Sequence, residues 1–224
     1  MGLSGGKESR YGLFRFVGKN VFAEEYEAVP DGRRKSWLGK GEAAGIVMGG
    51  DLRIRKAVEA DLDGVGKLYE DVCDYLDAHG NYPGWIKGIY PVRRDAERGL
   101  MVNALYVARI GERTVGAVIL THEPEDGYEN GKWLTEDDYR RIYVVHTLAV
   151  HPDFLKCGIG TELLAFAERV AREEQCVSIR LDVVKDNIPA ERLYQKCGYQ
   201  WTGTVSLGYE AYGLPWYQLY EKLL

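Results

Sequence analysis

The stretch that decides the fold runs from Leu148 to Leu164 and reads LAVHPDFLKCGIGTELL. A β-branched segment over 142–150 ends just before Pro152, and apolar side chains recur at helical spacing after Gly158. Glycines let a ligand approach the backbone, and a helix N-terminus offers unpaired N–H groups and a favourable dipole for a phosphate. Lys156 adds a positive charge. The stretch therefore predicts a strand, a tight turn and a helix whose first turn binds a phosphate or pyrophosphate.

Two other phosphate-binding motifs do not fit this loop. A P-loop requires Gly-Lys-Ser/Thr after its glycines, and that sequence is missing here. A dinucleotide fingerprint requires a third glycine or an alanine where this chain has Leu163. The loop therefore favours neither a P-loop kinase nor a dinucleotide-binding domain.

Hydrophobic periodicity places strands and helices on both sides of this stretch. Alternating segments predict strands over 52–57, 105–109, 114–121, 142–150, 177–183, 203–207 and 216–223. Helical spacing predicts helices over 62–76 (with Asp61 as N-cap), 93–100, 158–174 and 190–196. The acidic segment 123–138 is expected to be a loop. The order β-α-α-β-β-β-α-β-α-β-β predicts an α+β domain with a mixed sheet.

Composition narrows the class of protein further. A chain of 224 residues with 46% hydrophobic and 28% charged residues is long enough for one domain with a full core. Its net charge of −5 argues against a nucleic-acid partner, and no apolar run approaches the ~20 residues that span a membrane. The four cysteines form no CxxC pair and the four histidines show no metal spacing, so we expect a cytoplasmic protein without a metal.

The first 47 residues differ from the rest of the chain. They hold nine of the 27 glycines, show no sustained period, and carry eight basic and six acidic side chains. The remaining residues then hold a net charge of −7, which suits a cationic partner. We expect residues 1–47 to be a flexible or loosely docked extension, and residues 48–224 to form the domain.

Two motifs of the domain resemble those of one family. The stretch over 148–164 resembles the coenzyme A signature of the GNAT superfamily of acyl-CoA N-acyltransferases, and DNIPAERLYQKCGY, residues 186–199, resembles its second conserved segment. The resemblance covers residues 52–224 and implies the acyl-CoA N-acyltransferase fold, a mixed, splayed β-sheet flanked by helices. It also implies acetyl-CoA as co-substrate. One departure is Leu155, because the family usually has Gln or Arg there.

The resemblance implies where acetyl-CoA binds. The pyrophosphate would lie on backbone N–H groups of Lys156, Cys157, Gly158, Ile159, Gly160 and Thr161. The pantetheine arm would run beside the strand end formed by Leu148, Ala149 and Val150, where a backbone N–H polarises the thioester carbonyl. Asn187 resembles the asparagine that contacts coenzyme A.

The same resemblance implies direct attack of a primary amine on the acetyl thioester in a ternary complex. Tyr194 matches the tyrosine that serves the family as general acid. Many relatives carry a Glu as base on the strand before the loop, where this chain has His146. A histidine can take up the amine proton, but Ile142, Val144 and Leu148 on the same strand are apolar. Two interpretations of His146 stay open, a catalytic base or a core residue.

In this family the first helices and their loop contribute to the acceptor site. Tyr75, Tyr82, Trp85 and Tyr90 are the candidates here for an aromatic pocket that attracts an amine. The acceptor is expected to be a small-molecule amine, and the aromatic C-terminal strand allows a homodimer. The alternative function is a non-catalytic acyl-CoA sensor or interaction module with the same fold. Transfer of a longer acyl group is a further alternative.

Overall fold

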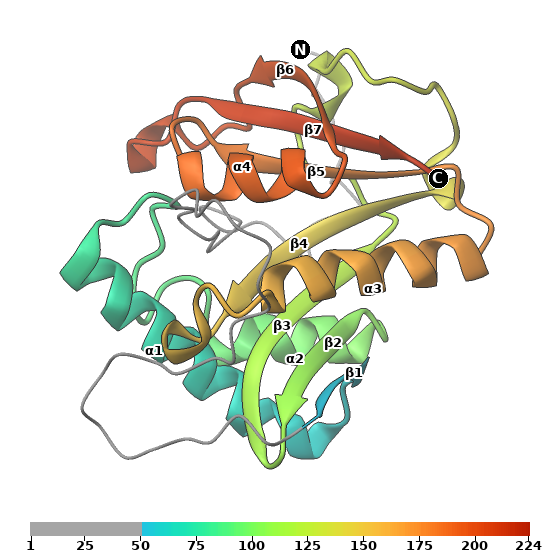
Figure 1. Ribbon diagram of the computed structural model, residues 1–224. Coiled ribbons are helices and arrows are strands. Elements are labelled where there is room, and N and C mark those ends of the chain that lie inside the picture. Colours follow the sequence, from blue (N-terminus) through green and yellow to red (C-terminus); the bar gives the residue numbers. More distant parts are fainter. Residues whose placement is uncertain (1–50) are drawn as a thin grey trace, which may run out of the picture.

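The computed structural model describes residues 51–224, which form a seven-stranded sheet in the order β1-β2-β3-β4-β5-β7-β6 (Figure 1). The strands are β1 Leu52–Lys56, β2 Leu105–Ile110, β3 Arg113–Thr121, β4 Ile142–Val150, β5 Ser178–Val184, β6 Gln200–Val205 and β7 Tyr217–Leu223. The helices are α1 Leu62–His79, α2 Arg93–Met101, α3 Ile159–Glu173 and α4 Ile188–Lys196. The expected extension over residues 1–47 lies outside the described residues.

The predicted order of elements is confirmed, and most boundaries agree within a few residues. The largest differences are at α1, which continues to His79 and ends at Gly80 with a φ of 113°, and at β6, which begins three residues early. Gln200 and Trp201 join β6 because they pair with Glu221 and Tyr220 of β7. Tertiary pairing, which the local pattern does not contain, extends this strand.

Asp61 precedes α1 as predicted, but its side chain does not cap that helix. The buried carboxylate accepts hydrogen bonds from Arg55, Arg109 and the backbone N–H of Val58 instead. These interactions tie β1 and β2 to the start of α1. They also lower the pKa of Asp61 against the opposing effect of its burial.

The two halves of the sheet separate between β4 and β5. These two strands are parallel and pair only over their first residues, Ile142–Val144 against Ser178–Arg180. Beyond these three pairs, the rest of β4 and the rest of β5 have no register with each other. Figure 1 shows the strands meeting near the C-terminus and separating toward the end where α4 lies. The sheet is therefore mixed and splayed, as expected.

Helices and one long connection cover the two faces. One face packs α3 and α4 against β2–β5 in an apolar cluster that includes Leu163, Leu193 and Tyr194. The other face packs α1 and α2 against β2 and β3. Beside them, Tyr128 from the connection between β3 and β4 packs with residues of β5, β6 and β7. Within residues 51–224, none of the helices is both long and apolar enough to span a membrane.

Candidate active site

A β-bulge in β4 shapes the edge of the splay. Ala117 of β3 pairs with Ala149, but Ile119 pairs with His146, so β4 holds one residue more than β3 over this interval. Thr147 within the bulge has a φ of 44°, which is rare for a β-branched residue. Its Oγ1 lies 2.5 Å from the Tyr90 hydroxyl, so the loop before α2 holds the bulge. Such strain is common at functional sites.

The bulge corrects the simple alternation expected for β4. Leu148 packs in the cluster on the α3 and α4 face, together with Val145. Val144 packs in the cluster of the opposite face. The extra residue reverses the alternation after His146, so Leu148 and His146 do not share a face as the sequence pattern suggested.

His146 is 1% exposed and both of its ring nitrogens have protein partners. Nε2 lies 2.9 Å from Oγ1 of Thr121, and Nδ1 lies 3.0 Å from Oε1 of Glu125. Glu125 belongs to the connection over 122–141 and is itself buried. Sequence reasoning placed Glu125 in an acidic loop without a role, and no local signal links it to β4. The two interpretations of His146, as a catalytic base and as a core residue, both remain predictions.

The loop between β4 and α3 has the geometry of an anion site. Lys156 and Gly158 have positive φ values of 63° and 78°, and Gly158 is the N-cap of α3. The first α-helical N–H bond is that of Glu162 to the Gly158 carbonyl, so the three preceding helical N–H groups have no intrahelical acceptor. The Cys157 N–H, a donor expected to bind the pyrophosphate, instead donates to the Phe154 carbonyl at 3.2 Å.

Other features of this loop fit the pyrophosphate of acetyl-CoA. Oγ1 of Thr161 is buried and has no hydrogen-bond partner among the described residues. Apart from its neighbours in sequence, no atom of the described chain lies within 4 Å of a Cβ built on Gly158, so there is space for a ligand beside this residue. Lys156 is exposed beside it. Leu155 packs against the apolar cluster of the α3 face and offers no polar group.

Tyr194 lies on the buried face of α4, between the rings of Tyr199 and Tyr220. It is fully buried, and its hydroxyl has no hydrogen-bond partner among the described residues. Burial, together with the negative charge of Asp182, raises the pKa of Tyr194 well above its usual value. Tyr194 is therefore a neutral phenol at physiological pH. In this state it can act as a proton donor, and it is not a phenolate base.

Two further buried residues stand beside α4. Asp182 of β5 accepts a hydrogen bond of 2.7 Å from the hydroxyl of Tyr128, which belongs to the β3–β4 connection. Asn187 is the N-cap of α4, and its side-chain oxygen accepts from the N–H of Ala190 at 3.4 Å. Contact of Asn187 with coenzyme A remains a prediction.

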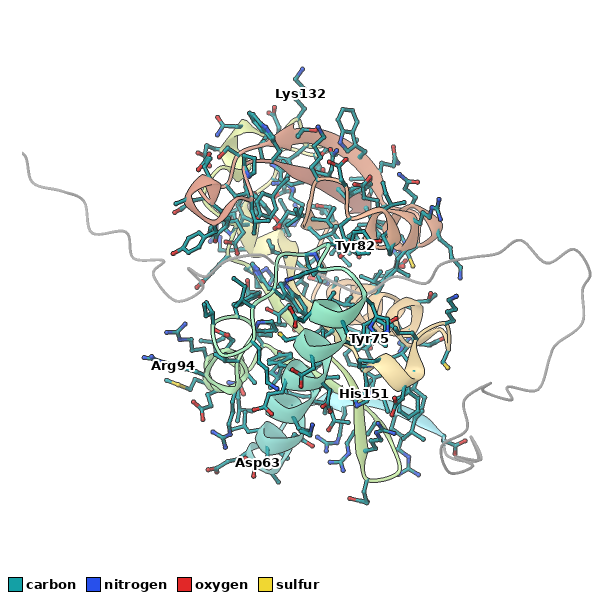
Figure 2. All side chains as sticks on the ribbon, turned by 90° about the vertical axis from the view of Figure 1, so that its left-hand side faces the viewer. Asp63, Tyr75, Tyr82, Arg94, Lys132 and His151 are labelled. Carbon is teal, nitrogen blue, oxygen red and sulfur yellow. The ribbon has the colours of Figure 1, made fainter. Side chains whose placement is uncertain are left out.

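The four aromatic residues expected at the acceptor site divide into two pairs. Tyr82 is 51% exposed, and Tyr75 stacks on His79 with 4.0 Å between ring centroids. Figure 2 shows both on the side of the molecule at which β4 and β5 separate. Trp85 and Tyr90 are buried in the apolar cluster of α1 and α2, edge to face at 6.0 Å. Their contact with an acceptor remains a prediction.

The loop that carries these residues reaches across to the other half of the sheet. A Cβ built on Gly84 would lie 2.8 Å from the side chain of Leu214, in the connection between β6 and β7. Asn81 holds the loop by bonding both the N–H and the carbonyl of Trp85. The two connections therefore meet at Gly84 and Leu214.

The connection over 122–141 borders a cavity of about 240 Å³ that is partly open to solvent. Its lining consists of Pro124, Glu125, Tyr128, Glu129, Trp133, Thr135, Glu136, Asp137, Tyr139 and Arg180. Arg180 is buried and pairs with Glu221 of β7 at 2.9 Å, and its guanidinium also donates to the Thr135 carbonyl. This buried network fixes the connection to β5 and β7. Within residues 51–224, no group of three His, Cys, Asp or Glu side chains is placed to hold a metal ion.

Comparison with known proteins shows which family the chain belongs to. The model of the Acetyltransferase (GNAT) family matches residues 67–199. The chain is 31% identical over 97 residues to streptothricin acetyltransferase of Escherichia coli, covering 43% of this chain and 47% of that protein. It is 32% identical over 106 residues to the UPF0157 protein YqkA of Bacillus subtilis (strain 168), covering 46% and 30%. The match spans less than half the length of either relative.

Solved structures agree with the fold. A GNAT-family acetyltransferase of Streptococcus agalactiae 2603 superposes with a TM-score of 0.62 at 20% identity, covering 77% of this chain and 95% of that one. The putative acetyltransferase YncA of Salmonella typhimurium, solved with its cofactor acetyl-CoA, gives a TM-score of 0.53 at 17% identity, covering 77% and 94%. At these identities the likeness concerns the fold. Because the family model matches more than half of its residues, the chain belongs to the GNAT acetyltransferase family, whose enzymes use acetyl-CoA.

Proposed function

We propose that the chain transfers the acetyl group of acetyl-CoA to a primary amine of a small molecule, by direct attack in a ternary complex. One observation carries the proposal: β4 and β5 diverge beyond their first three pairs, β4 leads into an anion-binding loop, and β5 leads into the helix that carries a buried phenol without a described partner. The loop precedes α3, and the phenol is Tyr194. The open glycine backbone at the start of α3 and the unsatisfied hydroxyl on α4 both lie in motifs that resemble those of the family, and this coincidence supports the proposal.

Binding would use the backbone more than side chains. The N–H groups of Lys156 and of residues 159–161, with the Lys156 ammonium, would hold the pyrophosphate. The edge of β4 over 148–150, which has no register with β5, would pair with the pantetheine arm. Bound acetyl-CoA supplies an activated acetyl group at the bulge, where a backbone N–H near Leu148 or Ala149 would stabilise the oxyanion.

The residues around the splay would then move protons. Tyr194 would donate a proton to the sulfur as the carbon–sulfur bond breaks, because its raised pKa keeps the phenol protonated. His146 would accept the proton that the attacking amine loses. Tyr75 and Tyr82, at the side where the strands separate, would contact the amine. The E. coli relative is a streptothricin acetyltransferase, which supports a small-molecule acceptor.

An amine screen tests this proposal. The full chain is first titrated with acetyl-CoA in a calorimeter and then assayed for thiol release with a library of primary amines, streptothricin included. The proposal expects saturable binding and thiol release that depends on particular amines. Absence of acetyl-CoA binding would disprove it.

A non-catalytic acyl-CoA-binding module is the second candidate, and Leu155 favours it. The side chain at this position packs on the apolar cluster where the family usually has a polar residue. A binding module would show acetyl-CoA affinity without thiol release for every amine of the screen. Amine-dependent release excludes it.

A further inference from the structure

Three buried side chains form a continuous row on the face of β4 opposite α3 and α4. Oγ1 of Thr121 lies 2.9 Å from Nε2 of His146, and Nδ1 of the same ring lies 3.0 Å from Oε1 of Glu125. All three residues are less than 9% exposed. They come from β3, from β4 and from the connection over 122–141, so the fold and not the local sequence brings them together.

The partners determine the state of the imidazole. An ionised carboxylate only accepts hydrogen bonds, so Nδ1 carries the proton that it donates to Glu125. Nε2 is then the ring nitrogen with a lone pair, and it lies closer to the Thr121 hydroxyl, at 2.9 Å, than the Glu123 carbonyl does, at 3.4 Å, so we assign the hydroxyl proton to Nε2. The same oxygen accepts the N–H of Glu123. A carboxylate that fixes the tautomer of a histidine leaves the opposite nitrogen ready to accept a proton.

The stability of the fold does not by itself explain why the carboxylate of Glu125 is buried. A buried carboxylate is stable only when it is paired, and a buried ion pair adds little net stability compared with apolar side chains of similar size. Glu125 also lines the cavity of about 240 Å³ under the 122–141 connection. It therefore joins a buried imidazole to a space that carries further acidic side chains.

We propose that Glu125 is the positioning residue of the proton acceptor, and that Thr121, His146 and Glu125 form a relay; this rests on the proposed acetyl transfer. When the amine has attacked, Oγ of Thr121 takes a proton from the new ammonium and passes its own proton to Nε2 of His146. The imidazolium is stabilised by the Glu125 carboxylate and later releases the proton toward the cavity. The electrons of the broken N–H bond stay on nitrogen, the tetrahedral adduct collapses with cleavage of the carbon–sulfur bond, and Tyr194 protonates the departing thiolate.

Other charged groups on this face are already engaged. Arg180 of β5 is paired with Glu221 and lies over the ring of Trp133. Asp182 of β5 accepts from the Tyr128 hydroxyl. Neither makes a described hydrogen bond to His146, so Glu125 is the carboxylate that the relay uses within residues 51–224.

The pH profile of Glu125→Gln tests the positioning role. We expect kcat to fall roughly 10²-fold, and the midpoint of the rise of kcat/KM with pH to move to lower pH, because the imidazolium loses a negative neighbour. The Kd of acetyl-CoA should not change. Glu123→Gln is the matched control. Its backbone N–H donates to Oγ1 of Thr121 and is kept in the variant, whereas its carboxylate has no hydrogen-bond partner among residues 51–224. It should leave rate and profile unchanged.

Thr121 gives an independent test that does not depend on the Glu125 variant folding. Thr121→Val keeps the shape and removes the hydroxyl, whereas Thr121→Ser keeps the hydroxyl. The relay predicts loss of turnover in the first and retention in the second, at equal acetyl-CoA affinity. Equal turnover of the two, or an unmoved pH profile in a folded Glu125→Gln, would overturn the relay. If the wild-type chain itself released no thiol with any amine, the proposed function would be overturned instead.

Discussion

At the scale of single residues, the site depends on buried polar groups that packing does not require. The hydroxyl of Tyr194 is the clearest example, because desolvating a hydroxyl without a partner is unfavourable by about 1–3 kcal/mol. A core built for stability alone would accept Phe at this position. The hydroxyl of Tyr199 shares this unsatisfied state. We infer a role for the Tyr194 hydroxyl because it also lies in the motif that resembles the family's.

Tyr194→Phe should therefore separate chemistry from folding. Removing the hydroxyl should lower kcat by roughly 10²-fold, because the departing sulfur loses its proton donor. Acetyl-CoA affinity should be kept, and the free energy of unfolding should stay equal or rise, since no described hydrogen bond is lost and a buried hydroxyl without a partner is removed. Steady-state kinetics, calorimetry and urea unfolding measure the three quantities.

Tyr199→Phe is the matched control for this variant. Tyr199 is also buried, packs against Tyr194, and has a hydroxyl without a described partner. It should leave kcat unchanged. A similar loss of kcat in both variants would show that the hydroxyl of Tyr194 has no special role.

At the scale of elements, the β4–α3 loop combines strain with openness. Gly158 has a φ of 78° and open space beside its α-carbon, and Gly111 in the turn between β2 and β3 has a φ of 58° and similar space. Alanine at either position should destabilise the fold by about 1 kcal/mol. Only Gly158→Ala should also weaken acetyl-CoA binding, by roughly tenfold, which is about 1.4 kcal/mol. If calorimetry gave equal acetyl-CoA affinities for the two variants, the loop would not be part of the cofactor site.

The same loop is joined to α1 through a titratable group. Nε2 of His151 lies 3.3 Å from Asp71 of α1, while Nδ1 accepts the N–H of Asp153. Burial, with the charge of Arg113, lowers the pKa of His151. The unfolded chain therefore binds more protons than the folded chain just below about pH 6.5, and this contribution to stability is lost as the pH falls.

His151→Asn should make the stability less sensitive to acid. Asn can still accept the Asp153 N–H but does not titrate. Urea unfolding at about pH 7.5 and about pH 5.5 should show a smaller loss of free energy in the variant than in the wild type. Equal losses would show that His151 does not contribute to the acid sensitivity of the fold.

The sequence predicted the elements well and the details of β4 poorly. Period-two and helical spacing found the strands and helices, because burial on one side of each element leaves that pattern in the chain. The bulge at Thr147 has no such pattern, since it depends on the pairing with β3 and the hydroxyl of Tyr90. For the same reason the sequence could not show that Trp85 and Tyr90 are buried.

At the scale of the whole molecule, the site is assembled from distant parts of the chain. The anion loop could be predicted because its residues are contiguous, and Tyr194 followed from a motif that resembles the family's. Glu125 could not be predicted, because its place beside His146 depends on the path of the whole 122–141 connection. That path is fixed by interactions with β5 and β7, such as Arg180 with Glu221.

The division of the chain at residue 47 is also a property of the whole molecule. We propose that residues 48–224 fold without the preceding segment, because the seven strands and the apolar clusters of the described sheet lie within them. A chain that starts at Met48 should unfold cooperatively with a similar Tm and bind acetyl-CoA with similar affinity. Aggregation or loss of a cooperative transition in scanning calorimetry would contradict this boundary.

The central claim is direct transfer of the acetyl group from acetyl-CoA to an amine within the splay. Its most direct measurement mixes the full chain with acetyl-CoA, with and without an amine from the screen, and follows thiol release and the masses of protein and amine. The account predicts release only with amine, one acetylated amine per thiol, and an unmodified protein. Release without amine, or an acetyl group on the chain during turnover, would contradict it.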